Sequence, residues 1–456
     1  MKKFKLFSSL AVLSLGALAL TSCGGTTTTK EAGAVSKDKE IVFYNTMGQN
    51  LQNVVKTAIE KFEEENPGWK VTSTQVGGYE DVYNTTVTNL TAGTQPDLAY
   101  CYADHVATYI TTKKVLDLNT FIYDEEIGYS MDEILDFVPG YYNEGLATNF
   151  GGYAKYGYSA DAMLTLPFSK STELMYYNKD ALDAYGLKVP TTWDEMWEVC
   201  DVLYEKYPLA VPLCYDSEAN WLINMCEQNG WNYTSADEAN HLTFKDDNNL
   251  AAWLDSLAAK VKAKPGYIET QTTYGAYTSG LFTKGVANNE SGCVFCIGSS
   301  GGASYQSTNK FKWGVAPIPG TEKNGTVNSS VISQGPSLVM LDQGNPEKHA
   351  MTWKFVKEIL DPTFQATFSM TSGYNPVRQS SFEDEDYKDW LADDTNIVAV
   401  AASVAKTLSN SFYTSPAFRG SADARVQMSS VVVYVLQGEK TGKKALEDAY
   451  KNCGGR

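Results

Sequence analysis

The feature that most constrains the fold of this sequence is the alternation of short strands with amphipathic helices that begins at residue 40. The strands are expected at residues 40–44, 69–75 and 95–100, with helices at 50–65 and 79–92 between them. Repeated units of this kind predict α/β layers with an open sheet, whose ligands bind beyond the carboxyl ends of the strands. A chain of 456 residues is long enough for two or three such domains.

The segment before residue 40 is typical of export rather than of a folded core. Lys2, Lys3 and Lys5 precede an apolar run at residues 6–20 that is too short to cross a bilayer comfortably. The run ends in Leu20-Thr21-Ser22-Cys23-Gly24, which resembles the lipobox of bacterial lipoproteins. That resemblance implies a signal peptide at 1–22, a diacylglycerol on the Cys23 thiol, and anchoring to the cell membrane. The alternative is an ordinary secretory signal followed by a chance cysteine. Residues 23–37 are small and polar, as expected of a flexible tether.

Composition excludes several classes of function. The chain has 37 Lys and Arg against 54 Asp and Glu, so a nucleic-acid partner is not expected. Three His leave little for a metal centre, and we predict neither a metal nor a cofactor. Cys293 and Cys296 have the spacing of a zinc or redox pair, but no second pair accompanies them, so we expect both to fill a buried strand. The 29 Tyr and nine Trp suit a pocket for polar, ring-shaped ligands.

A family resemblance appears in the block LPFSKSTELMYYNKD at residues 166–180. With this block, further segments resemble the extracellular solute-binding proteins of sugar-type ABC importers, at residues 95–97, 186–195, 284–287, 313–320, 353–355 and 373–377. The resemblance covers nearly all of the chain beyond the tether. It implies that the protein captures a small solute outside the cytoplasm and delivers it to a membrane permease.

The resemblance also implies a two-lobed clamp, in which each lobe is an open sheet flanked by helices and ligand binds between the lobes. Three segments would cross between the lobes near Pro167, Pro319 and Gly373 and act as the hinge. These crossings predict an N-lobe of residues 38–166 plus 320–372 and a C-lobe of residues 167–319 plus 373–456.

A sugar needs short polar groups, backbone amides and aromatic platforms. Ser299 and Ser300 lie in a Gly/Ser loop that follows an expected strand, where free amides and hydroxyls would face an oxygen-rich ligand. Tyr374 beside the third crossing and Trp231 after Asn229-Gly230 are expected to stack on the ligand. The alternatives are a plain turn, a hinge-packing Tyr and a core Trp. Tyr79 and Ser171 are candidates from the resemblance alone.

The sequence favours a mono- or oligosaccharide as the solute, with sn-glycerol 3-phosphate or a glycerophosphodiester as the alternative. Glycerol-phosphate binders of the same superfamily use a Tyr, a Ser, a Gly, the hinge Tyr and an Arg. In this chain those roles could fall to the residues Tyr79, Ser299 or Ser300, Gly335, Tyr374 and Arg419. Where those proteins present an acid, this chain has Ala103, with Asp104 one position late. Arg419 could instead pair with a surface acid such as Asp423.

An enzyme remains a remote alternative. Residues 298–302 match the G-x-S-x-G elbow of a serine hydrolase with Ser300 as nucleophile, and Asp342 and His349 follow in the required order. His349 opens a helix, however, and is expected to face solvent. No carboxylate pair stands out for a glycoside hydrolase. The lipobox and the full-length resemblance explain the sequence without catalysis, so we predict a binding protein rather than an enzyme.

Overall fold

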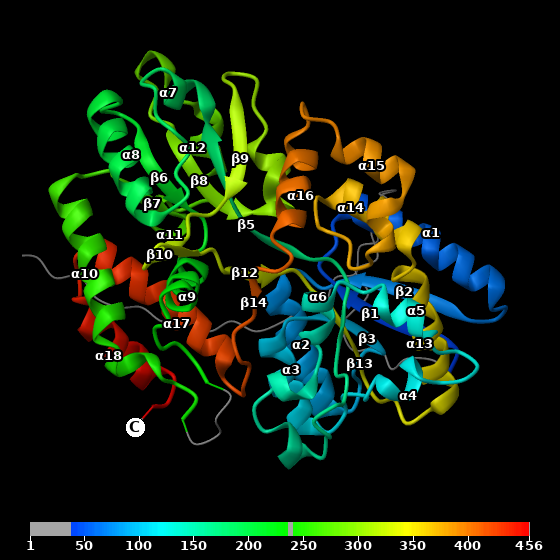
Figure 1. Ribbon diagram of the computed structural model, residues 1–456. Coiled ribbons are helices and arrows are strands. Elements are labelled where there is room, and N and C mark those ends of the chain that lie inside the picture. The colour runs from blue at the N-terminus through cyan, green and yellow to red at the C-terminus, as the bar shows by residue number, and fades with distance from the viewer. Residues whose placement is uncertain (1–37, 236–239, 456) are drawn as a thin grey trace, which may run out of the picture.

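The computed structural model describes residues 38–235 and 240–455. Figure 1 shows two α/β bodies side by side, one blue and cyan with yellow and orange additions, the other green with a red C-terminal part. Cys23, the signal peptide and the tether lie outside the described residues. Among the described residues, none of the helices is long and apolar enough to cross a membrane.

The N-lobe is built on a five-stranded sheet of order β2-β1-β3-β13-β4. β1 pairs in parallel with β2 and β3, whereas β13 runs antiparallel to β3 and β4. The strands are β1 (Glu40–Asn45), β2 (Lys70–Gln75), β3 (Leu98–Cys101), β4 (Leu166–Pro167) and β13 (Ser337–Met340). The three strands expected near the N-terminus are therefore present, and they form one sheet.

Helices bury apolar stripes in the N-lobe. α1 turns Val55, Ala58 and Phe62 into the core at helical spacing, and the Phe62 ring meets Phe355 edge to face at 5.6 Å. The N-lobe helices are α1 (Gln49–Glu65), α2 (Tyr79–Ala92), α3 (Ala103–Tyr109), α4 (Asn119–Ile122), α5 (Met131–Leu135), α6 (Pro139–Asn143), α13 (Pro346–Ile359), α14 (Pro362–Ser372) and α15 (Glu385–Leu391).

The C-lobe is built on a mixed sheet of order β14-β12-β5-β8-β6-β7, with β9 also pairing with β5. β8 is buried along almost its whole length, and Cys293 and Cys296 are fully buried in it, as predicted. The strands are β5 (Ser171–Asn178), β6 (Val211–Tyr215), β7 (Ile268–Thr270), β8 (Cys293–Ser299), β9 (Trp313–Pro317), β12 (Val331–Gln334) and β14 (Phe412–Tyr413). A hairpin of β10 (Thr321–Lys323) and β11 (Thr326–Asn328) lies apart from this sheet.

The C-lobe helices begin at side-chain caps in most cases. At the start of α8 the Thr192 hydroxyl accepts a hydrogen bond from the Glu195 amide. The Glu195 carboxylate accepts one from the Thr192 amide, which completes a capping box. The helices are α7 (Lys179–Asp183), α8 (Trp193–Lys206), α9 (Glu218–Asn229), α10 (Asn248–Ala263), α11 (Gln271–Tyr274), α12 (Ser279–Lys284), α16 (Ile397–Thr407), α17 (Ser421–Leu436) and α18 (Gly442–Asn452). α17 packs against α9, α10 and α18, which brings the end of the chain onto its middle.

Three segments of the chain pass between the two sheets. The first passes from β4 to β5, directly after Pro167. The second lies between Gln334 and Ser337 rather than near Pro319, because the chain first adds the β10–β11 hairpin and β12 on the C-lobe side. The third lies after Tyr387 rather than at Gly373, since residues up to Tyr387 still pack in the N-lobe core. Asn375 exchanges backbone hydrogen bonds with Lys170 of the first crossing, so the residues around Asn375, including Tyr374, lie beside that crossing and are counted here as part of the hinge.

Candidate ligand-binding site

A cavity of about 970 Å³ opens between the two lobes. It lies at the upper end of the range of about 300–1,000 Å³ that is typical of small-molecule sites. Its N-lobe wall comes from the start of α2 and the end of β3, and its C-lobe wall from the ends of β6 and β8 together with β5, α9 and α17. The site therefore lies beyond the carboxyl ends of strands, as expected for this architecture.

The N-lobe wall presents two tyrosines. Tyr79 is the first residue of α2, and Tyr102 follows β3 directly. Their ring centroids are 4.7 Å apart with the planes tilted by 54°. Burial raises the pKa of both phenols, so they stay neutral and can donate hydrogen bonds. Ala103 and Asp104 also line the cavity, and no protein donor to the Asp104 carboxylate is found in the described part of the chain.

The C-lobe wall contains a buried polar network centred on Glu173 in β5. The Glu173 carboxylate accepts from Asn220 Nδ2 and Asn224 Nδ2, each at 2.8 Å, and from the Tyr215 hydroxyl. Arg425 of α17 donates to Asn220 Oδ1. Burial raises the pKa of Glu173 to about 7, although the three donors and the Arg425 charge act in the opposite direction.

A second carboxylate, Asp216, follows β6 directly. Its Oδ1 accepts from the Thr278 amide and the Thr278 hydroxyl, each at 2.7 Å. Burial raises the pKa of Asp216, and these two hydrogen bonds lower it in part. Gly298 lies against this side chain, since a Cβ there would come within 3.3 Å of Asp216 Oδ2.

The hinge contributes Tyr374, which touches both lobes. Its hydroxyl lies 3.4 Å from the Tyr79 hydroxyl on the N-lobe side. Its ring covers Gly301 on the C-lobe side, where a Cβ would lie 2.9 Å from Tyr374 Cζ. Only a residue without a side chain allows this close approach.

The structure brings four of the residues proposed from the sequence to the cavity, namely Tyr79, Ser171, Ser299 and Tyr374. Ser300 is fully buried behind the wall, where its Oγ accepts from the Thr172 amide at 3.2 Å. Gly335 does not line the cavity. It has a φ of +87°, and a Cβ there would clash with the Ser169 carbonyl oxygen at 2.1 Å.

Two further candidates lie outside the cavity lining. Trp231 packs against Trp253 with ring centroids 6.2 Å apart, which corresponds to the core alternative. Arg419 is exposed and precedes Gly420, the N-cap residue of α17. Arg425, six residues later, takes the cavity position because it lies on the face of α17 that meets α9.

Sequence reasoning missed Glu173, Asp216, Gln306 and Arg425, all of which line the cavity. Three of them carry a signal in hindsight. Glu173 is the one charged residue in the buried strand β5, and Asp216 directly follows the apolar strand β6. Arg425 is the only basic residue in α17.

The serine-hydrolase arrangement is not assembled. His349 Nε2 accepts from the Gln343 amide at 2.9 Å and lies 3.3 Å from Asp342, both in the N-lobe. Ser300 belongs to the C-lobe and bonds Thr172 instead. The expectation that His349 faces solvent was wrong, because its side chain is only 14% exposed.

Comparison with known proteins agrees with this geometry. A family model described as bacterial extracellular solute-binding protein matches residues 57–394. The sn-glycerol-3-phosphate-binding periplasmic protein UgpB of Salmonella typhimurium is 24% identical over 356 residues, which cover 75% of each chain. Among solved structures, UgpB from Mycobacterium tuberculosis in complex with glycerophosphocholine gives a TM-score of 0.73 at 18% identity, covering 92% of this chain and 98% of that one. Maltose-bound MalE3 of T. maritima gives 0.70 at 17% identity, covering 91% and 99%.

These structural matches confirm the predicted two-lobed clamp of periplasmic binding proteins. The family model spans most of the chain. The matched residues include parts of both cavity walls and end after α15, before α17. The chain therefore belongs to the family of bacterial extracellular solute-binding proteins.

Proposed function

We propose that the cavity between the lobes binds a mono- or oligosaccharide, which this protein delivers to a membrane permease as the solute-binding component of an ABC importer. The observation that carries the proposal is one cavity of about 970 Å³ lined from both lobes and from the hinge. Such a cavity encloses a solute when the lobes close about the three crossings.

The lining has the chemistry that a carbohydrate requires. Tyr79, Tyr102 and Tyr374 offer ring surface together with hydroxyl donors. Ser171 and Ser299 offer small hydroxyls at the ends of strands. Sugars combine weakly apolar ring faces with many hydroxyls, and both features find partners here.

A glycerol phosphate or glycerophosphodiester is the second candidate. The relatives named for sn-glycerol 3-phosphate favour it, and Arg425 in the cavity could meet a phosphate. The carboxyl groups of Asp104 and Asp216 line the same cavity and oppose an anion, and Glu173, with a pKa of about 7, adds part of a negative charge. This excess of carboxylates is why we favour the neutral sugar.

Calorimetry on the full-length chain distinguishes the two solutes. Sugars, sn-glycerol 3-phosphate and glycerophosphocholine are titrated at low and high salt. A phosphorylated ligand should weaken as salt rises, and Arg425→Lys should weaken it more than tenfold because Lys lacks the planar fork. Arg419→Lys is the matched control in the same segment. A sugar should bind with little salt dependence, and tighter binding of glycerol phosphate would overturn the carbohydrate proposal.

We expect binding without turnover, and the match to a family of solute-binding proteins supports this expectation. Solution scattering should show a smaller radius of gyration with the bound sugar, and the sugar should be recovered unchanged. Hydrolysis of the ligand that is lost in Ser300→Ala would revive the serine-hydrolase alternative.

The lipid anchor at Cys23 is part of the same proposal and is supported by the lipobox-like segment that precedes it. The family places the chain outside the cytoplasm. Cys23→Ala should release the protein from the membrane fraction of its host. Unchanged membrane association of that variant would show that the Cys23 lipid is not the anchor.

A further inference from the structure

At its C-lobe end the cavity contains a recess formed by Asp216, Gly298 and Gln306, which we call the acceptor recess. A Cβ on Gly298 would lie 3.3 Å from Asp216 Oδ2 and 3.9 Å from Gln306 Nε2. The glycine therefore leaves open the space between two polar side chains from different loops.

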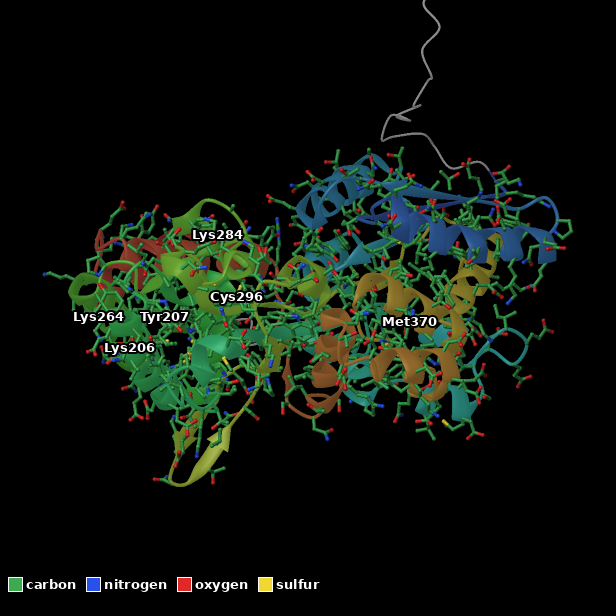
Figure 2. The ribbon with its side chains drawn as sticks, turned by 90° about the horizontal axis from the view of Figure 1, so that it is seen from above. Lys206, Tyr207, Lys264, Lys284, Cys296 and Met370 are labelled. Carbon is green, nitrogen blue, oxygen red and sulfur yellow. The ribbon has the colours of Figure 1, made fainter. Side chains whose placement is uncertain are left out.

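The hydrogen bonds behind this recess run in one direction. An ionised Asp216 can only accept, so the Thr278 hydroxyl donates to its Oδ1 at 2.7 Å. Cys296 Sγ lies 3.3 Å from that hydroxyl oxygen and can donate to it. Gln306 Nε2 in turn donates to Cys296 Sγ at 3.4 Å. Cys296 lies inside the C-lobe (Figure 2). Because it is fully buried, these contacts form behind the residues that line the cavity.

Two acceptor atoms of the recess residues lack a donor in the described chain, while Gln306 Nε2, which lies toward Gly298, uses one of its two N–H groups on Cys296. Gln306 is 3% exposed, and its Oε1 has no hydrogen-bond partner. Asp216 Oδ2 receives no donor from the residues that the structure describes. A buried acceptor without a donor destabilises the protein, so the recess is suited to a ligand that donates hydrogen bonds.

Acidic residues outnumber basic ones in the cavity lining, so the cavity is negative like the Asp216 carboxylate in the recess. Asp104, Glu173 and Asp216 line the cavity, and Arg425 is the one Lys or Arg among the lining residues of the described chain. The Arg425 guanidinium already donates to Asn220 and lies near Glu173. The negative field in the cavity is thus only partly compensated.

Two rings at the cavity add a surface that attracts cations. Tyr277 and Tyr305 line it and remain 66% and 75% exposed. The face of an aromatic ring carries negative potential and draws a cation on its way into the site.

We propose that the acceptor recess binds a protonated amine of the solute, so that the preferred ligand is an amino sugar or another polyhydroxylated solute with a basic nitrogen. An ammonium group offers several donors and no acceptor, and it compensates the carboxylate, whereas a hydroxyl offers one donor and no charge. The inference rests on the proposed carbohydrate function and names the substrate class within it.

Matched sugar pairs on the full-length chain test this inference by calorimetry. The pairs are glucosamine with glucose, galactosamine with galactose, and the fully deacetylated chitosan disaccharide with cellobiose. In at least one pair the amine should bind tenfold or more tightly than its hydroxyl partner. Asp216→Asn should reduce that ratio to below threefold while neutral-sugar binding persists. Gln306→Met, which keeps the charge, should reduce the ratio partly. Asp194→Asn, an exposed change on α8, is the control.

The outcomes separate the inference from the function that it refines. Equal or tighter binding of the hydroxyl partner in every pair would overturn the amine inference and leave the carbohydrate proposal in place. An amine preference that survives Asp216→Asn would also overturn it. Preference for a glycerol phosphate over all the sugars, or no binding by any sugar, would overturn both.

Discussion

The two walls of the cavity differ in how their side chains are held. On the N-lobe wall, Tyr79 and Tyr102 meet ring to ring, and Asp104 has no protein donor in the described chain. On the C-lobe wall, Glu173 and Asp216 each accept several hydrogen bonds from residues of that lobe. The C-lobe wall is therefore arranged before the solute arrives, and fixing polar groups in advance lowers the cost of binding. The N-lobe wall mainly supplies surface that closes over the solute.

The largest effect is expected from removing the buried ion pair between Lys170 and Glu144 in the hinge. Lys170 is 3% exposed, pairs with Glu144 at 2.6 Å, and donates to Ser337 Oγ at 3.2 Å. Lys170→Met leaves the Glu144 carboxylate buried and unpaired, which should reduce the free energy of unfolding by about 3–5 kcal/mol. Denaturant titration measures the loss.

Two controls sharpen the hinge prediction. Adding Glu144→Gln to Lys170→Met should restore much of the loss, because no charge then remains buried. Lys179→Met breaks an exposed pair with Asp183 and should cost at most about 1 kcal/mol. If Lys170→Met costs no more than Lys179→Met, the buried Lys170–Glu144 pair does not stabilise the folded chain.

The next largest effect concerns the buried carboxyl of the C-lobe wall. The pKa of Glu173 is about 7 in the folded chain against an ordinary value of 4.5. The folded state therefore binds this proton more tightly than the unfolded state. Its contribution favours folding below pH 4.5 and is lost as pH rises to 7, by up to about 3 kcal/mol at about 1.4 kcal/mol per pKa unit.

Thermal unfolding at pH 5 and pH 8 measures this loss. The wild type should be more stable at pH 5 by the part that Glu173 contributes, and Glu173→Gln should lack that part. Glu198→Gln, an exposed change on α8, should behave as wild type. An identical pH slope in Glu173→Gln and wild type would show that Glu173 is already ionised well below neutrality.

A glycine pair tests the contact between the hinge and the C-lobe wall. Gly301→Ala would place Cβ 2.9 Å from the Tyr374 ring, whereas a Cβ at Gly302 meets nothing within 4 Å. The Gly301 change should displace the Tyr374 ring at a cost of about 1–3 kcal/mol, or about 5- to 150-fold in affinity for the solute. Gly302→Ala should change affinity less than twofold. Equal losses of affinity in Gly301→Ala and Gly302→Ala would show that the position of the Tyr374 ring does not matter for ligand binding.

The smallest expected effect belongs to the N-lobe wall. Tyr79→Phe keeps the ring but removes the hydroxyl that lies 3.4 Å from Tyr374. One hydrogen bond of about 0.5–1.5 kcal/mol predicts a 2- to 12-fold loss of affinity in calorimetry. Tyr83→Phe, on the same helix but bonded to Thr108, should leave affinity unchanged. If Tyr79→Phe loses more affinity than Gly301→Ala, the N-lobe wall rather than the hinge contact contributes most to binding of the solute.

Local pattern identified the elements and some of the site. The apolar spacing of Val55, Ala58 and Phe62 was enough to predict α1, and position beside a turn or crossing was enough to select Ser299 and Tyr374. Position beside a turn also selected Trp231, and the family resemblance selected Arg419, yet both residues lie outside the cavity lining. Sequence position does not tell which way a side chain points once its helix packs against a partner.

The sequence alone was enough to assign the chain to the α/β class, because strand and helix periodicities act over a few residues and need no distant partner. The two-lobed clamp was an implication of the family resemblance. The sequence also determined the family, through a block of side chains along β5 and its neighbours. Only the tertiary structure decided the polarity of the cavity. Glu173, Asn220 and Arg425 come from three segments up to 252 residues apart in the numbering, and they meet only because α17 packs on α9 beside β5. Their burial and mutual hydrogen bonds set the charges that a solute meets, and neither exists before these elements pack.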